Sequence, residues 1–216
     1  MTQTPSRQAM IDAAERIVAE RGMPAMTLKD VQLAANQANK SAAKYHFGSR
    51  DGLIEAVIES RMAPVNTRRQ ELLDEITRAG EPTVRRAVEA LLRPLAAETL
   101  GRPGSHYARF LAQTMLDPAL ADIVQRHLRA ESYWSAKQLI IDLAPVPREV
   151  ALWRADNVMM LGIVTLAARE GRDRTATEAS ALIADLIDTC VAVLEAPSST
   201  PVPIDHDESR TAIPKE

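Results

Sequence analysis

The stretch that decides the fold lies at residues 27–50 and reads TLKDVQLAANQANKSAAKYHFGSR. Thr27 and Asp30 form a capping box, with Asp in place of the usual Glu or Gln, and this predicts a short helix that starts at Thr27. A polar run of four residues ends that helix. Asn39 or Ser41 can then cap another short helix, which continues to about residue 46. The stretch therefore predicts two short helices joined by a four-residue turn.

A further helix precedes this pair, and the start of a longer one follows it. Ser6 can cap a helix that runs to about Arg21 with apolar side chains on one face. Gly22 can end it, because Gly tolerates the left-handed conformation found just beyond helix ends. Gly48 and Ser49 mark the end of the third helix and the cap of the next one. The N-terminal region is therefore expected to hold three short helices.

Charge indicates what this helix pair can bind. The chain has a net charge of −3, which argues against a protein that coats nucleic acid by bulk charge. Residues 35–50 nevertheless contain three cations, Lys40, Lys44 and Arg50, and no acid. The DNA major groove is about 12 Å wide and admits one α-helix, whose Lys, Ser and Asn side chains can reach base edges and phosphates. The pattern therefore indicates a local contact with double-stranded DNA.

Four segments carry a family resemblance. They read IDAA at residues 11–14, ERG at 20–22, MTL at 26–28 and NKSAAKYHFGSRDGLI at 39–54. On these segments, residues 7–58 resemble the DNA-binding domain of the TetR family of bacterial transcription regulators. The last segment is similar to the branch of that family whose recognition helix ends in Tyr-His-Phe-Gly-Ser.

Two positions depart from the usual family pattern. Asn36 stands where the family usually has Gly, and Asn adopts the left-handed conformation less freely than Gly does. Lys44 stands where the commonest family form has Tyr, and the turn before the third helix is one residue longer than in that form.

The resemblance implies DNA contacts that the chemistry of each residue supports. Thr27 at a helix N-terminus is placed to bind one phosphate, and Arg50 would bind a second. Lysines and small polar residues at the start of the third helix are the candidates for base edges, while Phe47 is expected in the core. The expected DNA-binding residues are Thr27, Asn39, Lys40, Ser41, Lys44, Tyr45, His46 and Arg50. The alternatives are a solvated surface for the two lysines and a structural role for His46.

The rest of the chain also reads as helical. Aromatic residues make up 3 % of the chain, and Ala is frequent, which favours an all-α fold. A long helix after Leu53 is expected to be kinked or interrupted at Pro64. Further helices are predicted at residues 82–100, 106–115, 118–143, 147–168 and 177–194. We expect a DNA-binding domain at 1–58 with a connector helix to about 78, a helical effector-binding and dimerisation domain at 59–196, and a disordered tail at 197–216.

The last two helices carry more apolar surface than one core needs, and two such helices can pair with their copies in a second chain. The resemblance implies the same homodimer, which places two recognition helices about 34 Å apart on a near-palindromic operator. The alternative is an ordinary monomer core. The expected interface residues are Met160, Leu161, Val164, Leu182, Ile183, Leu186, Ile187 and Cys190. Cys190 itself is expected to be a buried, small apolar residue rather than a nucleophile.

Family members of this type usually bind a small molecule in the larger domain and thereby change their affinity for DNA. The resemblance therefore implies a repressor that a small apolar or amphipathic organic effector releases. The residues that could line its pocket are Tyr107, Phe110, Met115, Tyr133, Trp134 and Trp153. Large apolar residues at helical spacing also occur in ordinary cores, and this is the alternative.

Other classes of function are less well supported. The histidines show no metal-ligand spacing, no Gly-rich phosphate loop is present, and no Ser lies in a nucleophile elbow, so neither catalysis, a cofactor nor a metal is expected. The longest nearly apolar run, 158–168, is too short to span a membrane. One Cys and no secretory signal favour the cytoplasm. A helical small-molecule-binding or adaptor protein that does not read DNA, or an activator of the same fold, remain the alternatives.

Overall fold

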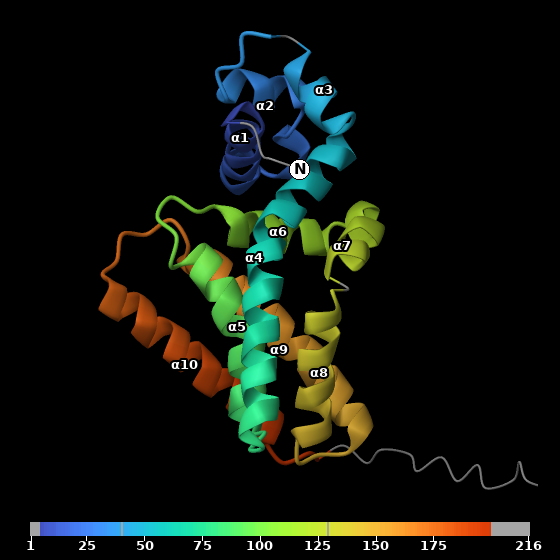
Figure 1. Ribbon diagram of the computed structural model, residues 1–216, viewed down its shortest axis with the longest axis vertical. Coiled ribbons are helices and arrows are strands. Elements are labelled where there is room, and N and C mark those ends of the chain that lie inside the picture. The colour runs from blue at the N-terminus through green and yellow to red at the C-terminus, as the bar shows by residue number, and fades with distance from the viewer. Residues whose placement is uncertain (1–4, 40, 129, 200–216) are drawn as a thin grey trace, which may run out of the picture.

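The computed structural model describes residues 5–39, 41–128 and 130–199, and this part of the chain is helical without any strand, which confirms the all-α prediction (Figure 1). Its helices are α1 (Pro5–Arg21), α2 (Leu28–Ala34), α3 (Ala42–Phe47), α4 (Arg50–Ala79), α5 (Val84–Thr99), α6 (Tyr107–Leu116), α7 (Ala121–Leu128), α8 (Glu131–Leu143), α9 (Arg148–Arg169) and α10 (Ala176–Glu195), with short 3-10 turns η1 (Met23–Ala25) and η2 (Pro118–Leu120). Most of the tail predicted at 197–216 lies outside the described residues.

Helices α1, α2 and α3 lie together at one end of the molecule, and α4 runs from them along the length of the remaining helices (Figure 1). We call α1 to α3 with the first turns of α4 the head, and α5 to α10 with the rest of α4 the body. The head helices begin and end where local signals predict. The Thr27 hydroxyl accepts from the Asp30 N–H at 3.1 Å, and the Ser49 hydroxyl accepts from the Gly52 N–H at 3.0 Å. Gly22 and Gly48 both have positive φ, 85° and 70°, at helix ends.

Helix α4 continues through Pro64, so the prediction of an interruption there is wrong. Pro64 is exposed, whereas Met62 and Val65 on either side of it are buried. A proline removes only one hydrogen bond of a helix, and the packing of its neighbours can hold the remaining turns in place. The result is one helix of 30 residues that links head and body.

The prediction of a single helix at 118–143 is also wrong, because this segment forms η2, α7 and α8. Asp117 caps η2 with its side chain, and Ala130 has the extended ψ of 140° that separates α8 from the helix before it. Helix α5 begins after Thr83, two residues later than predicted from Pro82, since the Thr83 hydroxyl accepts from the Arg86 N–H.

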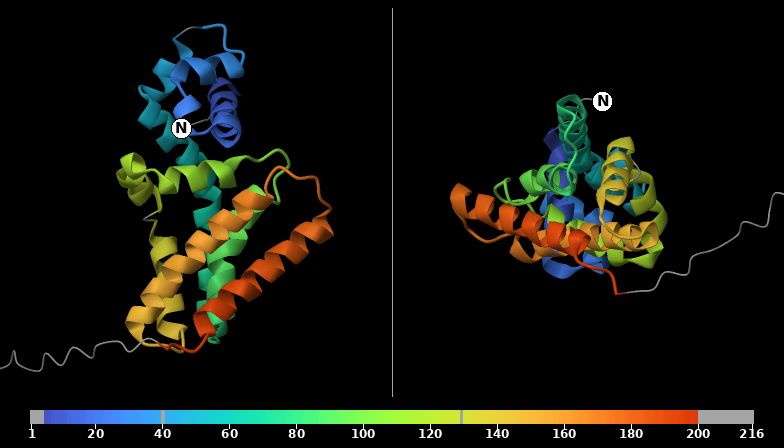
Figure 2. Two further views of the ribbon diagram at one scale, coloured as in Figure 1. Left: turned by 180° about the vertical axis from the view of Figure 1, so that it is seen from behind. Right: turned by 90° about the horizontal axis from the view of Figure 1, so that it is seen from below.

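Helices α9 and α10 end within two residues of their predicted bounds and lie side by side on one face of the body (Figure 2). By length and composition alone α9 could cross a membrane, with a mean hydropathy of 1.3 over its most apolar 18 residues. Its packing against α5, α6, α8 and α10 accounts for that composition, since a core helix needs the same residues.

Candidate DNA-binding site

The turn between α2 and α3 is held by short-range contacts. Asn36 has a φ of 52°, so it takes the left-handed conformation for which the family pattern uses Gly. The Gln37 N–H donates to the Gln32 carbonyl at 3.1 Å, and the Asn39 carboxamide oxygen accepts from the Ser41 N–H at 2.9 Å. These bonds set the direction in which the chain enters α3. Lys40 lies outside the described residues.

Helix α3 has one buried face and one exposed face. Ala42, Ala43 and Phe47 are buried in the head, which confirms the core position predicted for Phe47. On the other face Lys44 is exposed and the side chain of Tyr45 is 85 % exposed. A large aromatic side chain this exposed on a short helix is available to a partner.

The remaining predicted residues flank this face. Asn39, Ser41 and Thr27 are exposed, and His46 is half-buried, with its ring centroid 5.2 Å from that of Tyr45 in an edge-on arrangement. The Thr27 hydroxyl is engaged locally, because it also donates to the Asp30 carboxylate. The Thr27 hydroxyl therefore acts first as a helix cap, and a phosphate at this point would be bound through the backbone N–H groups of the first turn of α2.

Arg50 has a structural task that the sequence did not indicate. Its Nε donates to the Met26 carbonyl at 3.1 Å and its Nη2 to the Met23 carbonyl at 2.9 Å. These bonds tie the start of α4 to η1 and to Met26, two residues before α2. Two of its five N–H donors are engaged in this way, so Arg50 positions α2, and its remaining donors could meet a phosphate.

Two cations of the head are not among the predicted DNA-binding residues. Lys29 is exposed in the first turn of α2, close to Thr27, in a stretch whose sequence pattern predicts only a helix cap. Arg7 in α1 places its guanidinium carbon 5.6 Å from the centroid of the Phe47 ring, and so lies against the C-terminal end of α3. Lys29 could have been found from the sequence, because it lies two residues after Thr27. Arg7 could not, because only the packing of α1 against α3 brings it close to Phe47.

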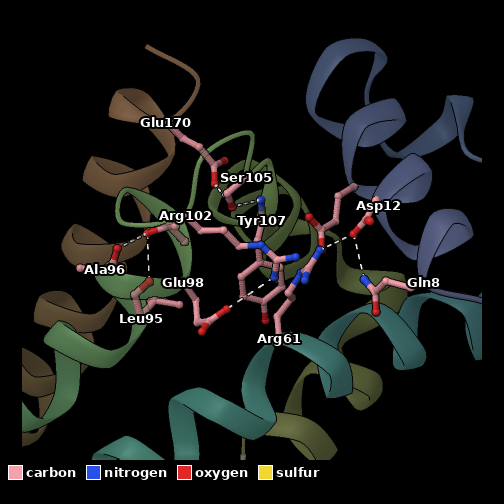
Figure 3. Close-up of polar contacts among 12 residues, drawn as sticks. Gln8, Asp12, Arg61, Leu95, Ala96, Glu98, Arg102, Ser105, Tyr107 and Glu170 are labelled. Atoms are coloured by element: carbon pink, nitrogen blue, oxygen red, sulfur yellow. Dashed lines mark hydrogen bonds and ion pairs between the residues drawn. The ribbon is translucent and has the colours of Figure 1, made fainter. Parts of the chain in front are cut away.

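Polar contacts join the head to the body. Arg61 of α4 is buried, and its Nη2 lies 2.6 Å from the Asp12 carboxylate of α1, which also accepts from Gln8 (Figure 3). Its Nε forms an ion pair with Glu15, which is buried too. Burial alone would lower the pKa of Arg61, but the hydrogen bond and charge of Glu15, together with those of Asp12, outweigh it and raise that pKa. The orientation of α1 relative to α4 is therefore set by a charged cluster.

Comparison with known proteins agrees with this geometry. Residues 10–57 match the sequence model described as bacterial regulatory proteins, tetR family. The head of this chain is a TetR-family DNA-binding domain. These residues run from α1 into the first turns of α4 and so contain all the predicted DNA-binding residues. No curated protein sequence matches the chain at a significant level.

Solved structures of TetR-family proteins share the complete fold. A TetR transcriptional regulator from Legionella pneumophila is 14 % identical, with a TM-score of 0.55, and the match covers 90 % of this chain and 100 % of that one. A protein assigned to the TetR family from Mesorhizobium loti is 13 % identical, with a TM-score of 0.53 and coverage of 89 % and 98 %. The TetR-family head and this fold together identify a DNA-binding transcriptional regulator.

The TetR-type body places the predicted interface residues in two groups. Leu186, Ile187 and Cys190 of α10 are buried within the chain itself, so their assignment to a surface between two chains is corrected. They pack against the core because α10 turns that side towards α5 and α9. Burial also raises the pKa of the Cys190 thiol to about 11. The residues that keep exposed or half-buried side chains are Met160, Leu161, Val164, Leu182 and Ile183.

The residues predicted to line an effector pocket differ in their burial. Tyr107 and Phe110 are fully buried and stack with ring centroids 6.4 Å apart, and Tyr133 is half-buried. Trp134 and Trp153, by contrast, are 46 % and 56 % exposed on the surface. The assignment of these residues to a pocket therefore stays a prediction. Met115 is half-buried against the core.

Proposed function

We propose that this protein is a cytoplasmic, homodimeric repressor that binds a near-palindromic operator and is released from it by a small organic effector. The exposed face of α3 carries the DNA-binding part of the proposal. Lys44 and Tyr45 project from a helix whose other face is fixed in the head, so they are presented on a rigid element. In this arrangement α3 enters the major groove, Lys44 and Ser41 meet base edges, and Tyr45 and His46 contact the sugar-phosphate backbone.

A second copy would pack on α9 and α10. Val164 is 49 % exposed, and Trp153, Met160 and Val164 recur at positions that share one face of α9. Leu182 and Ile183 lie half-buried on the adjacent helix. Apolar side chains exposed on two neighbouring helices are typical of a four-helix interface between two chains.

Helix α6 supplies a connection through which an effector in the body could move the head. At its N-terminus the carboxylate of Glu170, the residue that follows α9, accepts from the backbone N–H groups of Ala108 and Arg109, each at 3.0 Å. One turn later on the same helix, Gln113 bonds to the head through the Val18 carbonyl and the Met23 N–H. A shift of α6 relative to α9 would therefore move η1, which ends two residues before Thr27, the cap of α2.

The decisive experiment is a mobility-shift titration of the purified protein with the DNA immediately upstream of its coding region, in the presence of excess unrelated DNA. A discrete complex that Lys44→Ala weakens and Arg78→Ala leaves unchanged would support a sequence-specific regulator. Arg78 is the matched control because it is exposed at the opposite end of α4. Failure to shift this DNA or any duplex selected from a random pool would favour an adaptor, and increased transcription on binding would favour an activator.

A further inference from the structure

The body contains a buried cation without an anionic partner. Arg69 of α4 is 1 % exposed. Its Nη1 donates to the Asn66 carboxamide oxygen at 2.8 Å and its Nη2 to the Leu91 carbonyl at 3.5 Å. Its Nε has no hydrogen-bond partner, and no carboxylate of the described residues forms an ion pair with it.

Arg61 lies eight residues earlier on the same helix and is also buried, but its charge is balanced by two carboxylates. Around Arg69 burial lowers the pKa of the guanidinium to about 10, and the groups that oppose this effect are the hydroxyls of Tyr133 and Tyr107. The guanidinium carbon also lies 6.0 Å from the centroid of the Tyr133 ring. A buried charge without a counter-charge is strongly unfavourable, and so it is a candidate anchor for an anion from outside the chain.

A hydrogen-bond donor in the same interior is also unused. Tyr107 is fully buried, its backbone N–H donates to the Ser105 hydroxyl (Figure 3), and its own hydroxyl has no partner among the described residues. The charges of both Arg61 and Arg69 influence the pKa of Tyr107, which burial raises. The two arginines are about 12 Å apart along α4, and Tyr107 lies close enough to both for their charges to act on its hydroxyl.

A groove at the surface shares Asn66 with the surroundings of Arg69. It lies between α4 and the start of α8, has a volume of about 450 Å³, and includes Asn66 and Ser132 in its wall. The Ser132 hydroxyl donates to the Asn66 oxygen at 3.5 Å, and the same oxygen accepts from Arg69. The outer wall carries three exposed acids, Glu71, Asp74 and Glu131. Solvent screens these exposed acids, whereas the charge of the buried Arg69 is screened less.

We propose that the effector is an organic monocarboxylate with an apolar body, whose carboxylate pairs with Arg69 and accepts from the Tyr107 hydroxyl. One guanidinium matches one negative charge, and its fork of donors fits the two oxygens of a carboxylate. A neutral tyrosine adds a donor without adding charge. The apolar body of the ligand would lie among the core side chains of α4, α5 and α8. This inference rests on the proposed function, and it places the effector beside the Arg61 cluster that joins body and head.

The test is a calorimetric titration of the full-length protein, without DNA, with butyrate, octanoate, benzoate and phenylacetate, each paired with its primary amide. The variants are Arg69→Met and Tyr107→Phe. The matched control is Arg68→Met, because Arg68 is the neighbouring residue, exposed and paired with Glu71 at 2.7 Å. Thermal unfolding of each variant reports whether it is folded.

We expect at least one acid to bind the parent and Arg68→Met equally, its amide to bind at least tenfold more weakly, Arg69→Met to lose at least tenfold in affinity and Tyr107→Phe several-fold. Equal binding of acid and amide, unchanged affinity in Arg69→Met, or no binding by any of the four acids would overturn the proposal. Should Arg69→Met not fold, an unchanged affinity in Tyr107→Phe would overturn it as well. Because the titration contains no DNA, its outcome is independent of whether the head binds an operator.

Discussion

The side-chain nitrogen of Gln113 donates to the carbonyl oxygen of Val18 at 2.8 Å, across 95 residues of sequence. The oxygen of the same carboxamide accepts from the Met23 N–H at 3.0 Å. One side chain therefore satisfies the last turn of α1 and the start of η1 together, and connects both to α6 of the body. The head and the body are joined here and at the Arg61 cluster.

We expect Gln113→Leu to lower the free energy of unfolding by about 1–2 kcal/mol, since it leaves the Met23 N–H without its partner and leaves the Val18 carbonyl with only its bond from the Gly22 N–H. Urea denaturation measures this, and hydrogen exchange should show faster exchange of the Met23 N–H. Gln138→Leu is the control, because Gln138 makes an exposed bond to Asp142 within α8. Equal costs in the two variants would show that the Gln113 contact has no special role.

We expect Lys44→Ala to weaken operator binding by several-fold to tenfold without changing the free energy of unfolding, because Lys44 is exposed on the face of α3 that we propose to contact DNA. If Lys44 also neutralises a phosphate, the slope of log affinity against log salt concentration should fall by about one. Titrations at several salt concentrations, with Arg78→Ala as the control, measure both quantities. An equal loss in both variants would mean that only overall charge matters.

Arg50→Ala should act through the folding of the head. It removes two bonds from a charged donor to the carbonyls of Met23 and Met26, and we expect a loss of about 1–3 kcal/mol in stability. Operator binding should weaken for all sequences alike, since α2 and its first turn lose their position. Arg50→Lys keeps the charge but cannot make both bonds, so it should resemble Arg50→Ala in stability. If Arg50→Lys is as stable as the parent, the positioning role is wrong.

Gly52→Ala should destabilise the head by about 3 kcal/mol. A Cβ at this position would lie 2.2 Å from the carbonyl oxygen of Phe47, which is backbone and cannot move without shifting the end of α3. Asp51→Ala is the control; it lies exposed in the same turn and should cost about 0.5 kcal/mol through the helix dipole. Thermal unfolding compares the two, and similar midpoints would contradict the expectation.

Two carboxyl groups should give opposite pH dependence. Burial raises the pKa of Glu15, and the bond and charge of Arg61 offset this only in part. A carboxyl whose pKa is higher in the folded state than in the unfolded state contributes most to the free energy of unfolding at low pH. This contribution is lost as the pH rises through the folded-state pKa. Hydrogen bonds from the Thr175 N–H and hydroxyl lower the pKa of Glu178, whose contribution is present above the ordinary carboxyl pKa and lost as the pH falls.

From pH about 4 to about 7, Glu15→Gln should therefore gain stability relative to the parent, and Glu178→Gln should lose it. Urea denaturation at intervals across this range measures the difference for each variant. Parallel curves for parent and Glu15→Gln would show that the folded and unfolded states bind protons equally at this residue.

The sequence by itself determined most of the helix boundaries and the face of α3. Thr27 and Ser49 cap helices, and Gly22 and Gly48 end them, through hydrogen bonds and φ preferences that act within four residues. Such signals can be read from a few consecutive residues. The alternation of buried and exposed residues along α3 is equally local, so Phe47 was correctly placed inside.

Only the tertiary structure decided which helices continue and which charges are paired. Helix α4 passes Pro64 because packed neighbours hold its turns, and Arg50 bonds to carbonyl groups 24 and 27 residues earlier in the chain. The contrast between Arg61, with two carboxylates, and Arg69, with none, has the same origin. Burial and ion pairing depend on which other helices pack around a residue, and a residue's own neighbours in sequence do not carry that information.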